Sequence, residues 1–132
     1  MPLPNNHPLD EQTVTCFTSS FGTTPIAGVA RAPFRGVIVK VGFIANLAWT
    51  GTLTVTPTII PAAADGTAPG SGTAITGGAF TMAATNSAPG STNSIAPSGA
   101  NMVNEDDVIR FVPSGATATA GTGTFFAVIQ QV

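Results

Sequence analysis

A thiol and an imidazole are the first pair of side chains in this sequence that could do chemistry together. The chain has one cysteine, Cys16, and one histidine, His7, and a nucleophilic thiolate needs a neighbouring base to take its proton. Cys16 falls inside the alternating run Thr13–Phe17, where a buried, inert thiol is the commoner state. His7 lies in a proline-rich segment. We therefore expect no catalytic residue, no cofactor and no enzymatic activity.

An acidic run, Asn104-Glu105-Asp106-Asp107, is the one cluster of oxygen ligands in the chain. Several converging oxygens could hold a calcium ion, but the alternating acidic spacing of a calcium loop is absent. The alternative is a turn in which the carboxylates accept hydrogen bonds from backbone amides before the next strand. The turn is the favoured interpretation, so no metal ion is expected.

Glycine-rich segments are weaker candidates for a site. Gly70-Ser71-Gly72 and Gly121-Thr122-Gly123 lack both the lysine and the following helix of a phosphate-binding loop. Asp65-Gly66 is typical of a turn, because nothing fixes a second carboxylate beside Asp65.

Aromatic and basic residues near turns are the candidates for contacts with a partner. Trp49 lies between two predicted strands, where an indole offers a large contact area, although half-buried core packing is the favoured interpretation. Arg31 and Arg35 flank Phe34, and each could bind a carboxylate on another protein or the acidic run 104–107. The proline-rich N-terminal arm either is disordered or orders on a partner. The partner-binding candidates are Pro2, Leu3, Pro4, Pro8, Leu9, Arg31, Phe34, Arg35 and Trp49.

Charge and composition exclude several classes of function. Four basic residues and a net charge of −2 cannot neutralise the roughly six to ten phosphates that a duplex-binding protein contacts, so no nucleic-acid partner is expected. No run approaches the ~18 apolar residues of a membrane span. A secretory signal is absent as well, so we expect synthesis and folding in the cytoplasm. One cysteine excludes an internal disulfide.

Short alternating runs separated by turns predict the elements that must position these residues. With 15 Gly and 11 Pro among 132 residues, little helix can form. Strands are predicted at 13–17, 26–32, 36–44, 52–59, 73–84, 107–112 and 123–132, with a bulge at Gly77-Gly78 and a long loop at 86–100. Their spacing predicts an all-β, antiparallel, jelly-roll-like β-sandwich. The chain divides into an extended N-terminal arm with the first edge strand, 1–24, and a β-sandwich domain, 25–132.

The same alternation predicts which side chains fill the core. One face of the strongest strand carries Val37, Val39, Val41 and Phe43. The inward sets of two other strands are Leu53, Val55 and Ile59, and Phe125, Ala127 and Ile129. In 107–112 the core residue is left open among Val108, Ile109 and Phe111.

The low charge suggests how the chain works. Charged residues make up 8% of the sequence, against roughly a quarter in an average soluble domain. Thr and Ala, the commonest residues, make weakly hydrated surfaces suited to packing against copies or a larger assembly. An assembly subunit is therefore favoured over a freely soluble domain with a Thr-rich surface.

One segment resembles a known group of proteins. Residues 29–41, which read Val-Ala-Arg-Ala-Pro-Phe-Arg-Gly-Val-Ile-Val-Lys-Val, are similar to the R-A-P-F-x-G-x-V strand pair of small head decoration (cement) proteins and related structural proteins of tailed bacteriophages. A Thr-rich strand, an Asp-Gly loop and a turn from Asn101 to Ile109 follow in the same order, so the similarity covers about residues 26–132. These proteins commonly have Gly-Asp where this chain has Asp106-Asp107.

The resemblance implies a jelly-roll-like sandwich, often trimeric, on the exterior of the capsid. Such a subunit binds the major capsid protein and locks neighbouring capsomers, and the N-terminal arm would reach an adjoining subunit. The alternative is a phage fibre or tail-tip module that binds a host glycan or receptor through Trp49 and the loop 86–100.

Overall fold

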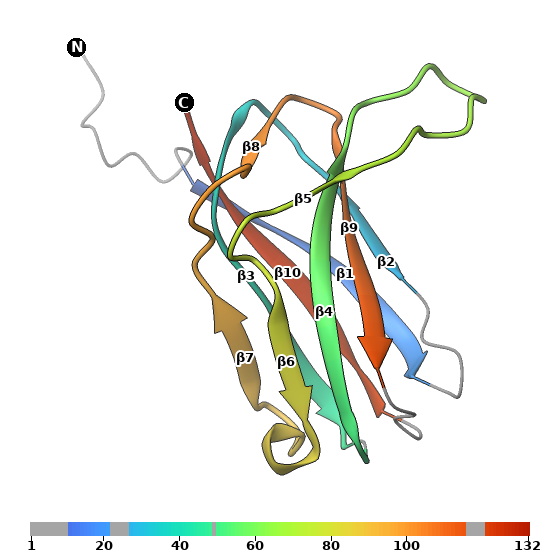
Figure 1. The fold of residues 1–132 in the computed structure, drawn as a ribbon, viewed down its shortest axis with the longest axis vertical. Coiled ribbons are helices and arrows are strands. Elements are labelled where there is room, and N and C mark those ends of the chain that lie inside the picture. The colour runs from blue at the N-terminus through green and yellow to red at the C-terminus, as the bar shows by residue number, and fades with distance from the viewer. Residues whose placement is uncertain (1–10, 22–26, 49, 116–120) are drawn as a thin grey trace.

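A computed structural model describes residues 11–21, 27–48, 50–115 and 121–132 of the chain, and this part contains ten strands and one 3-10 turn (Figure 1). The strands are β1 (Glu11–Phe21), β2 (Gly28–Arg31), β3 (Gly36–Leu47), β4 (Thr52–Ile60), β5 (Thr73–Ala74), β6 (Phe80–Ala83), β7 (Thr92–Ile95), β8 (Met102–Val103), β9 (Val108–Gly115) and β10 (Gly121–Gln131). The 3-10 turn, η1, is Ala84–Asn86.

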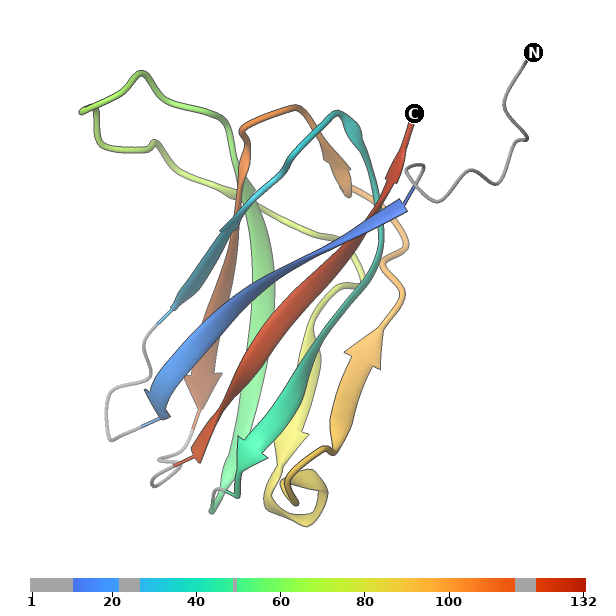
Figure 2. The same cartoon turned by 180° about the vertical axis from the view of Figure 1, so that it is seen from behind.

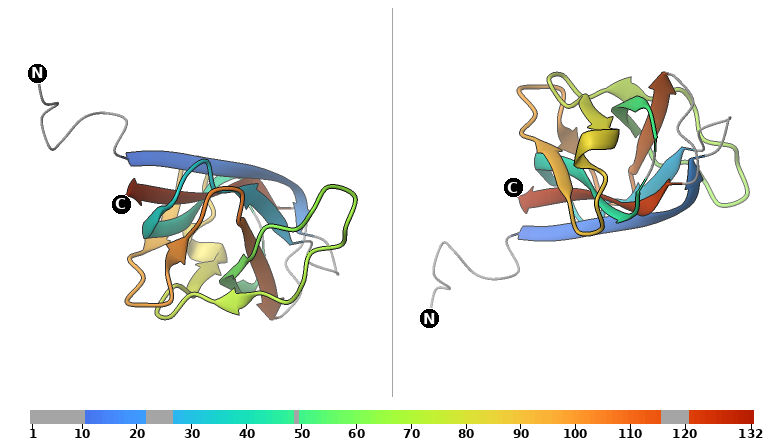
Figure 3. Two further views of the ribbon diagram at one scale, coloured as in Figure 1. Left: turned by 90° about the horizontal axis from the view of Figure 1, so that it is seen from above. Right: turned by 90° about the horizontal axis from the view of Figure 1, so that it is seen from below.

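The strands form two five-stranded antiparallel sheets that pack face to face (Figures 1 and 3). Sheet A has the order β1-β10-β3-β7, with β8 also paired to β3, and sheet B has the order β2-β9-β4-β5, with β6 also paired to β4. The chain crosses between the sheets from β1 to β4, and β9 and β10 return between the earlier strands, which is the order of a jelly roll. The predicted antiparallel, jelly-roll-like sandwich is therefore confirmed. Figure 2 shows β1 at the edge of sheet A.

Phenylalanine rings join the two sheets at the centre of the core. Phe125 of β10, in sheet A, stacks on Phe111 of β9, in sheet B, with ring centroids 4.9 Å apart and planes 4° apart. The centroids of Phe43 and Phe80 lie 5.0 Å and 6.4 Å from that of Phe125. One side chain from sheet A thus contacts rings from both sheets.

The predicted inward residues of β4 and β10 are all buried, as expected: Leu53, Val55, Ile59, Phe125, Ala127 and Ile129. In β9, Ile109 and Phe111 are fully buried and Val108 is half-buried, which settles the choice that the sequence left open.

A bulge in β3 overturns part of the predicted core face. Lys40 pairs with Val128, but Ile38 pairs with the next residue of β10, so Val39 is an extra residue in the ladder. An extra residue reverses the alternation of the strand. Ile38 is therefore fully buried, whereas Val37 and Val39 are only half-buried. The prediction for those two valines was wrong, while that for Val41 and Phe43 is confirmed.

Two polar stretches also differ from the prediction. The single strand expected at 73–84 is two short strands, β5 and β6, separated by a turn at Gly77, whose φ is +67°. The loop expected at 86–100 contains β7, which pairs with residues 41–44 of β3. The sequence of β7, Thr-Asn-Ser-Ile, has no apolar alternation. β7 is a strand because its backbone pairs with β3 at the sheet edge, and such pairing leaves no pattern of apolar residues in the sequence.

Candidate functional site

The structure places part of the predicted partner-binding set. Arg31 ends β2, and its Nη1 lies 3.8 Å from Oδ1 of Asp106, a pair so exposed that it contributes little to stability. Asp106 belongs to the acidic run, which the sequence offered as one of two partners for Arg31. Phe34 is half-buried and packs partly against the core, and Arg35 is exposed beside it. Six further candidates lie outside the described residues: Pro2, Leu3, Pro4, Pro8, Leu9 and Trp49.

The acidic run forms a turn that ties two segments together. Asp107 is 6% exposed, and its Oδ1 and Oδ2 accept hydrogen bonds from the backbone N–H groups of Ala62 (3.1 Å) and Asn104 (2.8 Å). Asp106 has a φ of +69°, in the left-handed region that aspartate tolerates and glycine prefers. Within the described ranges, no group of three or more His, Cys, Asp or Glu side chains could hold a metal ion. The predicted turn is confirmed.

Cys16 has the surroundings of a structural thiol. Its side chain packs partly against the core, and a Cβ added at Gly28 would come within 2.7 Å of its Sγ. Burial raises the pKa of the Cys16 thiol to about 11, whereas an attacking thiol has a lowered pKa. His7, the other half of the predicted dyad, lies outside the described residues.

We expect Cys16 to react slowly with alkylating reagents. At pH 8 the raised pKa leaves about 100-fold less thiolate than an ordinary cysteine has, and iodoacetamide labelling of the native chain, followed by mass spectrometry, measures the rate. The urea-unfolded chain is the control, and equal labelling rates in the folded and unfolded states would contradict a buried, unreactive Cys16.

The same pKa shift makes stability depend on pH. Because the pKa of the Cys16 thiol is higher in the folded state, the contribution of this thiol to stability is complete below about pH 9 and declines as the pH rises toward 11.

A weakly charged surface covers the outer side of sheet A, and we call it the sheet A face. Strand register and alternation turn the following residues outward: Glu11, Thr13, Thr15, Val37, Lys40, Gly42, Ile44, Thr92, Ser94, Met102, Thr124, Phe126, Val128 and Gln130. Glu11 and Lys40 are the charged residues among them, and most others are apolar or carry a hydroxyl. Phe126 lies across Gly42, where an added Cβ would come within 2.8 Å of the ring. This face is therefore apolar and hydroxyl-rich at its centre.

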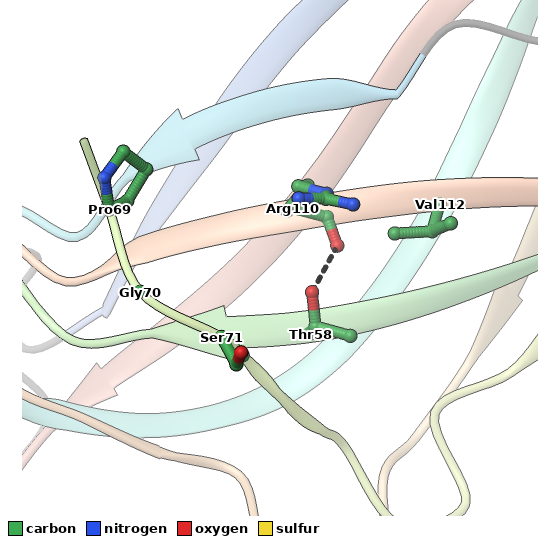
Figure 4. Close-up of a pocket in the computed structure, with 7 residues that line it drawn as sticks. Thr58, Pro69, Gly70, Ser71, Arg110 and Val112 are labelled. Carbon is green, nitrogen blue, oxygen red and sulfur yellow. Dashed lines mark hydrogen bonds between the residues drawn. The ribbon is translucent and has the colours of Figure 1, made fainter.

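A polar groove lies on the opposite side of the sandwich, and we call it the sheet B groove (Figure 4). Its volume is about 510 Å³, and its walls are the outer side of β4 and β9 and the returning half of the connection 61–72. The lining residues are Thr58, Pro69, Gly70, Ser71, Gly72, Arg110 and Val112.

Two strands and a glycine-rich segment position these groups. Thr58 and Arg110 are cross-strand partners, and the Thr58 hydroxyl donates to the Arg110 carbonyl oxygen at 3.3 Å. Gly72 passes so close to β4 that an added Cβ would lie 2.9 Å from Ile60, whereas an added Cβ at Gly70 would meet no atom within 4 Å. Gly72 therefore brings the segment against the sheet, and the space beside the Cα of Gly70 is open.

Arg110 is the cation of this groove. In the part of the chain that the structure describes, no carboxylate lies within 4.0 Å of its guanidinium, and Arg31–Asp106 is the ion pair present. Asp65 and Asp106 line a neighbouring hollow of about 170 Å³ that shares Pro69 with the groove. The sequence analysis did not select Arg110 as a site residue, and it considered Gly70-Ser71-Gly72 only as a phosphate-binding loop. The jelly-roll topology brings these two distant segments together, and no local sequence motif indicates that they meet.

The fold and its two surfaces define a jelly-roll β-sandwich with a weakly charged face on one sheet and a polar groove on the other. No protein-family model matches the chain, and no curated protein sequence matches it. Among solved structures, it is similar to the family 11 carbohydrate-binding module from Clostridium thermocellum in complex with a β-1,3-1,4-mixed-linked tetrasaccharide. The identity is 12%, the TM-score is 0.43, and the match covers 92% of this chain and 84% of that chain. No helix among the described residues is long and apolar enough to cross a membrane.

Proposed function

We propose that this chain is a structural protein of a phage virion, a capsid decoration (cement) subunit that binds the major capsid protein and stabilises the head lattice. It acts without catalysis, as a homo-oligomer for which a trimer is favoured, on the exterior of a capsid assembled in the host cytoplasm. The observation that carries the proposal is the sheet A face, whose centre holds Phe126, Val128 and Ile44 among hydroxyl groups, with Lys40 beside them.

The chemistry of the sheet A face suits contact with protein. Ile44 is 42% exposed and offers its apolar side chain to a partner, whereas Phe126 is 7% exposed and packs beneath the surface of the face. Burying apolar atoms stabilises a complex by about 25 cal/mol per Å², and threonine hydroxyls lose little side-chain entropy when they are covered. Few charges have to be desolvated when such a face is covered.

The size of the face favours an array of many weak contacts. Strands about 4.8 Å apart, with about 3.3 Å per residue, make the face roughly 20 Å by 30 Å, or on the order of 600 Å². A stable two-protein interface buries about 800 Å² on each partner. One copy therefore binds modestly, and oligomers that engage several lattice sites at once gain affinity by multivalency. The arm candidates Pro2, Leu3, Pro4, Pro8 and Leu9 precede edge strand β1 of the same sheet and belong to the proposed contact.

A charge placed on the sheet A face tests this proposal. Ile44→Lys should lower the occupancy of undecorated capsids at least tenfold, because an ammonium group would have to be desolvated in the contact. Co-sedimentation with capsids measures the occupancy, and circular dichroism checks the fold.

Thr54→Lys is the matched control, since Thr54 is an exposed strand residue on the outer side of sheet B. It should bind capsids as the unchanged chain does. Equal occupancy for both variants, or a loss confined to Thr54→Lys, would contradict docking through sheet A.

A second candidate function is a module that binds a host glycan or receptor, and the sheet B groove favours it. The sequence placed this function at Trp49 and the loop 86–100. Trp49 lies outside the described residues, and 86–100 contains edge strand β7. The groove at Arg110 offers a different location, on the side of the sandwich opposite the sheet A face. Capsid docking and ligand binding are therefore compatible in one subunit.

A further inference from the structure

We propose that the sheet B groove binds a sugar that carries a carboxylate, such as a uronic or sialic acid residue, with Arg110 as the group that recognises the acid. The proposal rests on the second candidate function and is independent of docking through sheet A. Three properties of the groove carry it: a cation with no carboxylate partner among the described residues, a mixed lining and the volume.

The cation selects a singly charged, planar anion. A guanidinium binds a carboxylate through two parallel hydrogen bonds, and no carboxylate of the described residues lies within 4.0 Å of Arg110. A phosphate would carry more charge, but among the described residues Arg110 is the one basic side chain that lines the groove. The neighbouring hollow is lined by Asp65, Asp106 and Arg31, and because Arg31 pairs with Asp106 one net negative charge remains there, which opposes a dianion more strongly than a monoanion. The local charge thus favours a carboxylate.

The rest of the lining suits a sugar ring. The Ser71 hydroxyl can both donate and accept hydrogen bonds, as sugar hydroxyls do, and the Thr58 hydroxyl, which donates to the Arg110 carbonyl oxygen, can accept them. Gly70 is exposed and an added Cβ there would meet nothing within 4 Å, so a ligand can approach the backbone at this residue. Val112 and Pro69 supply apolar surface for the C–H groups of a ring.

The volume fits a ligand of this size. About 510 Å³ lies within the roughly 300–1,000 Å³ of small-molecule sites. The lining residues that the structure describes include no aromatic side chain, so they offer a ring no stacking surface and each copy binds weakly. Many copies on one particle would raise the effective affinity for a glycan-coated surface.

Titration of the full-length chain followed by NMR tests the proposal. Glucuronic acid and the methyl glycoside of N-acetylneuraminic acid should shift the backbone amide signals of Gly70, Ser71 and Gly72, while glucose should not. Arg110→Gln should weaken acid-sugar binding at least tenfold. Lys40→Gln removes the same charge from the opposite sheet and should leave sugar binding as it was. Both side chains are exposed, so both variants should fold.

The remaining outcomes overturn the proposal in different ways. If acetate or inorganic phosphate shifts the same amides with equal affinity, the groove recognises any small anion and the sugar assignment fails. If glucose binds as well as glucuronic acid, Arg110 does not select the ligand. If no probe shifts these signals, the groove is not a binding site. Capsid occupancy of Arg110→Gln, measured separately, should equal that of the unchanged chain, so failure here leaves docking through sheet A standing.

Discussion

Phe125→Ala should destabilise the folded chain by about 4 kcal/mol, because this ring contacts aromatic rings from both sheets. Phe125 is fully buried, stacked on Phe111 at 4.9 Å and close to Phe43 at 5.0 Å. Truncating a buried phenylalanine removes its apolar contacts and leaves a cavity, at about 3–5 kcal/mol. Since domains are stable by only about 5–15 kcal/mol, a large part of the total would be lost. Urea unfolding followed by circular dichroism measures the change.

Two variants control this experiment. Phe125→Leu keeps much of the volume and should cost about 1.5 kcal/mol. Phe34→Ala deletes the same atoms from a half-buried ring at the edge of the core and should cost less than half as much as Phe125→Ala. If the two alanine variants were equally stable, Phe125 would not hold the central place that its ring contacts indicate.

The strands that bury one face could be predicted from the sequence, because their alternation survives in the fold. In β4 and β10, the residues that the pattern turns inward, such as Leu53 and Ile129, are buried in the structure. β3 does not, because the bulge at Val39 depends on how the strand pairs with β10. β7 could not be predicted either: its polar side chains show no period, and its conformation comes from backbone pairing with β3.

Some features of the candidate surfaces could likewise be predicted from the sequence, and others could not. A low charge is a property of composition, so a weakly charged exterior could be expected from the sequence. The acidic turn could also be expected, since the carboxylates of 104–107 precede a strand and have backbone amides within reach. The sheet B groove could not, because Ser71 and Arg110 meet only through the topology of sheet B. Arg110 in isolation reads as an exposed strand residue.

Asp107→Ala should destabilise the chain by about 3 kcal/mol and disturb the sheet B groove as well. The carboxylate is 6% exposed and accepts two backbone hydrogen bonds, one from Asn104 in its own turn and one from Ala62. Hydrogen bonds to a charged group contribute about 1.5–3 kcal/mol each, and alanine leaves both donors without that acceptor. Ala62 lies near the start of the connection 61–72, whose returning half forms one wall of the groove, so releasing it should also shift the amide signals of Gly70–Gly72.

Two further substitutions test whether the effect depends on the charge of the Asp107 carboxylate and on its position in the turn. Asp107→Asn retains one acceptor oxygen and should lose about half as much stability as Asp107→Ala. Glu105→Ala removes an exposed carboxylate from the same turn and should change stability by less than about 0.5 kcal/mol. Thermal unfolding should place the Asp107→Ala midpoint about 10 °C below that of the unchanged chain. A midpoint equal to that of Glu105→Ala would mean that Asp107 does not anchor the connection. In that case, the close packing of Gly72 against β4 would hold the connection 61–72 on sheet B.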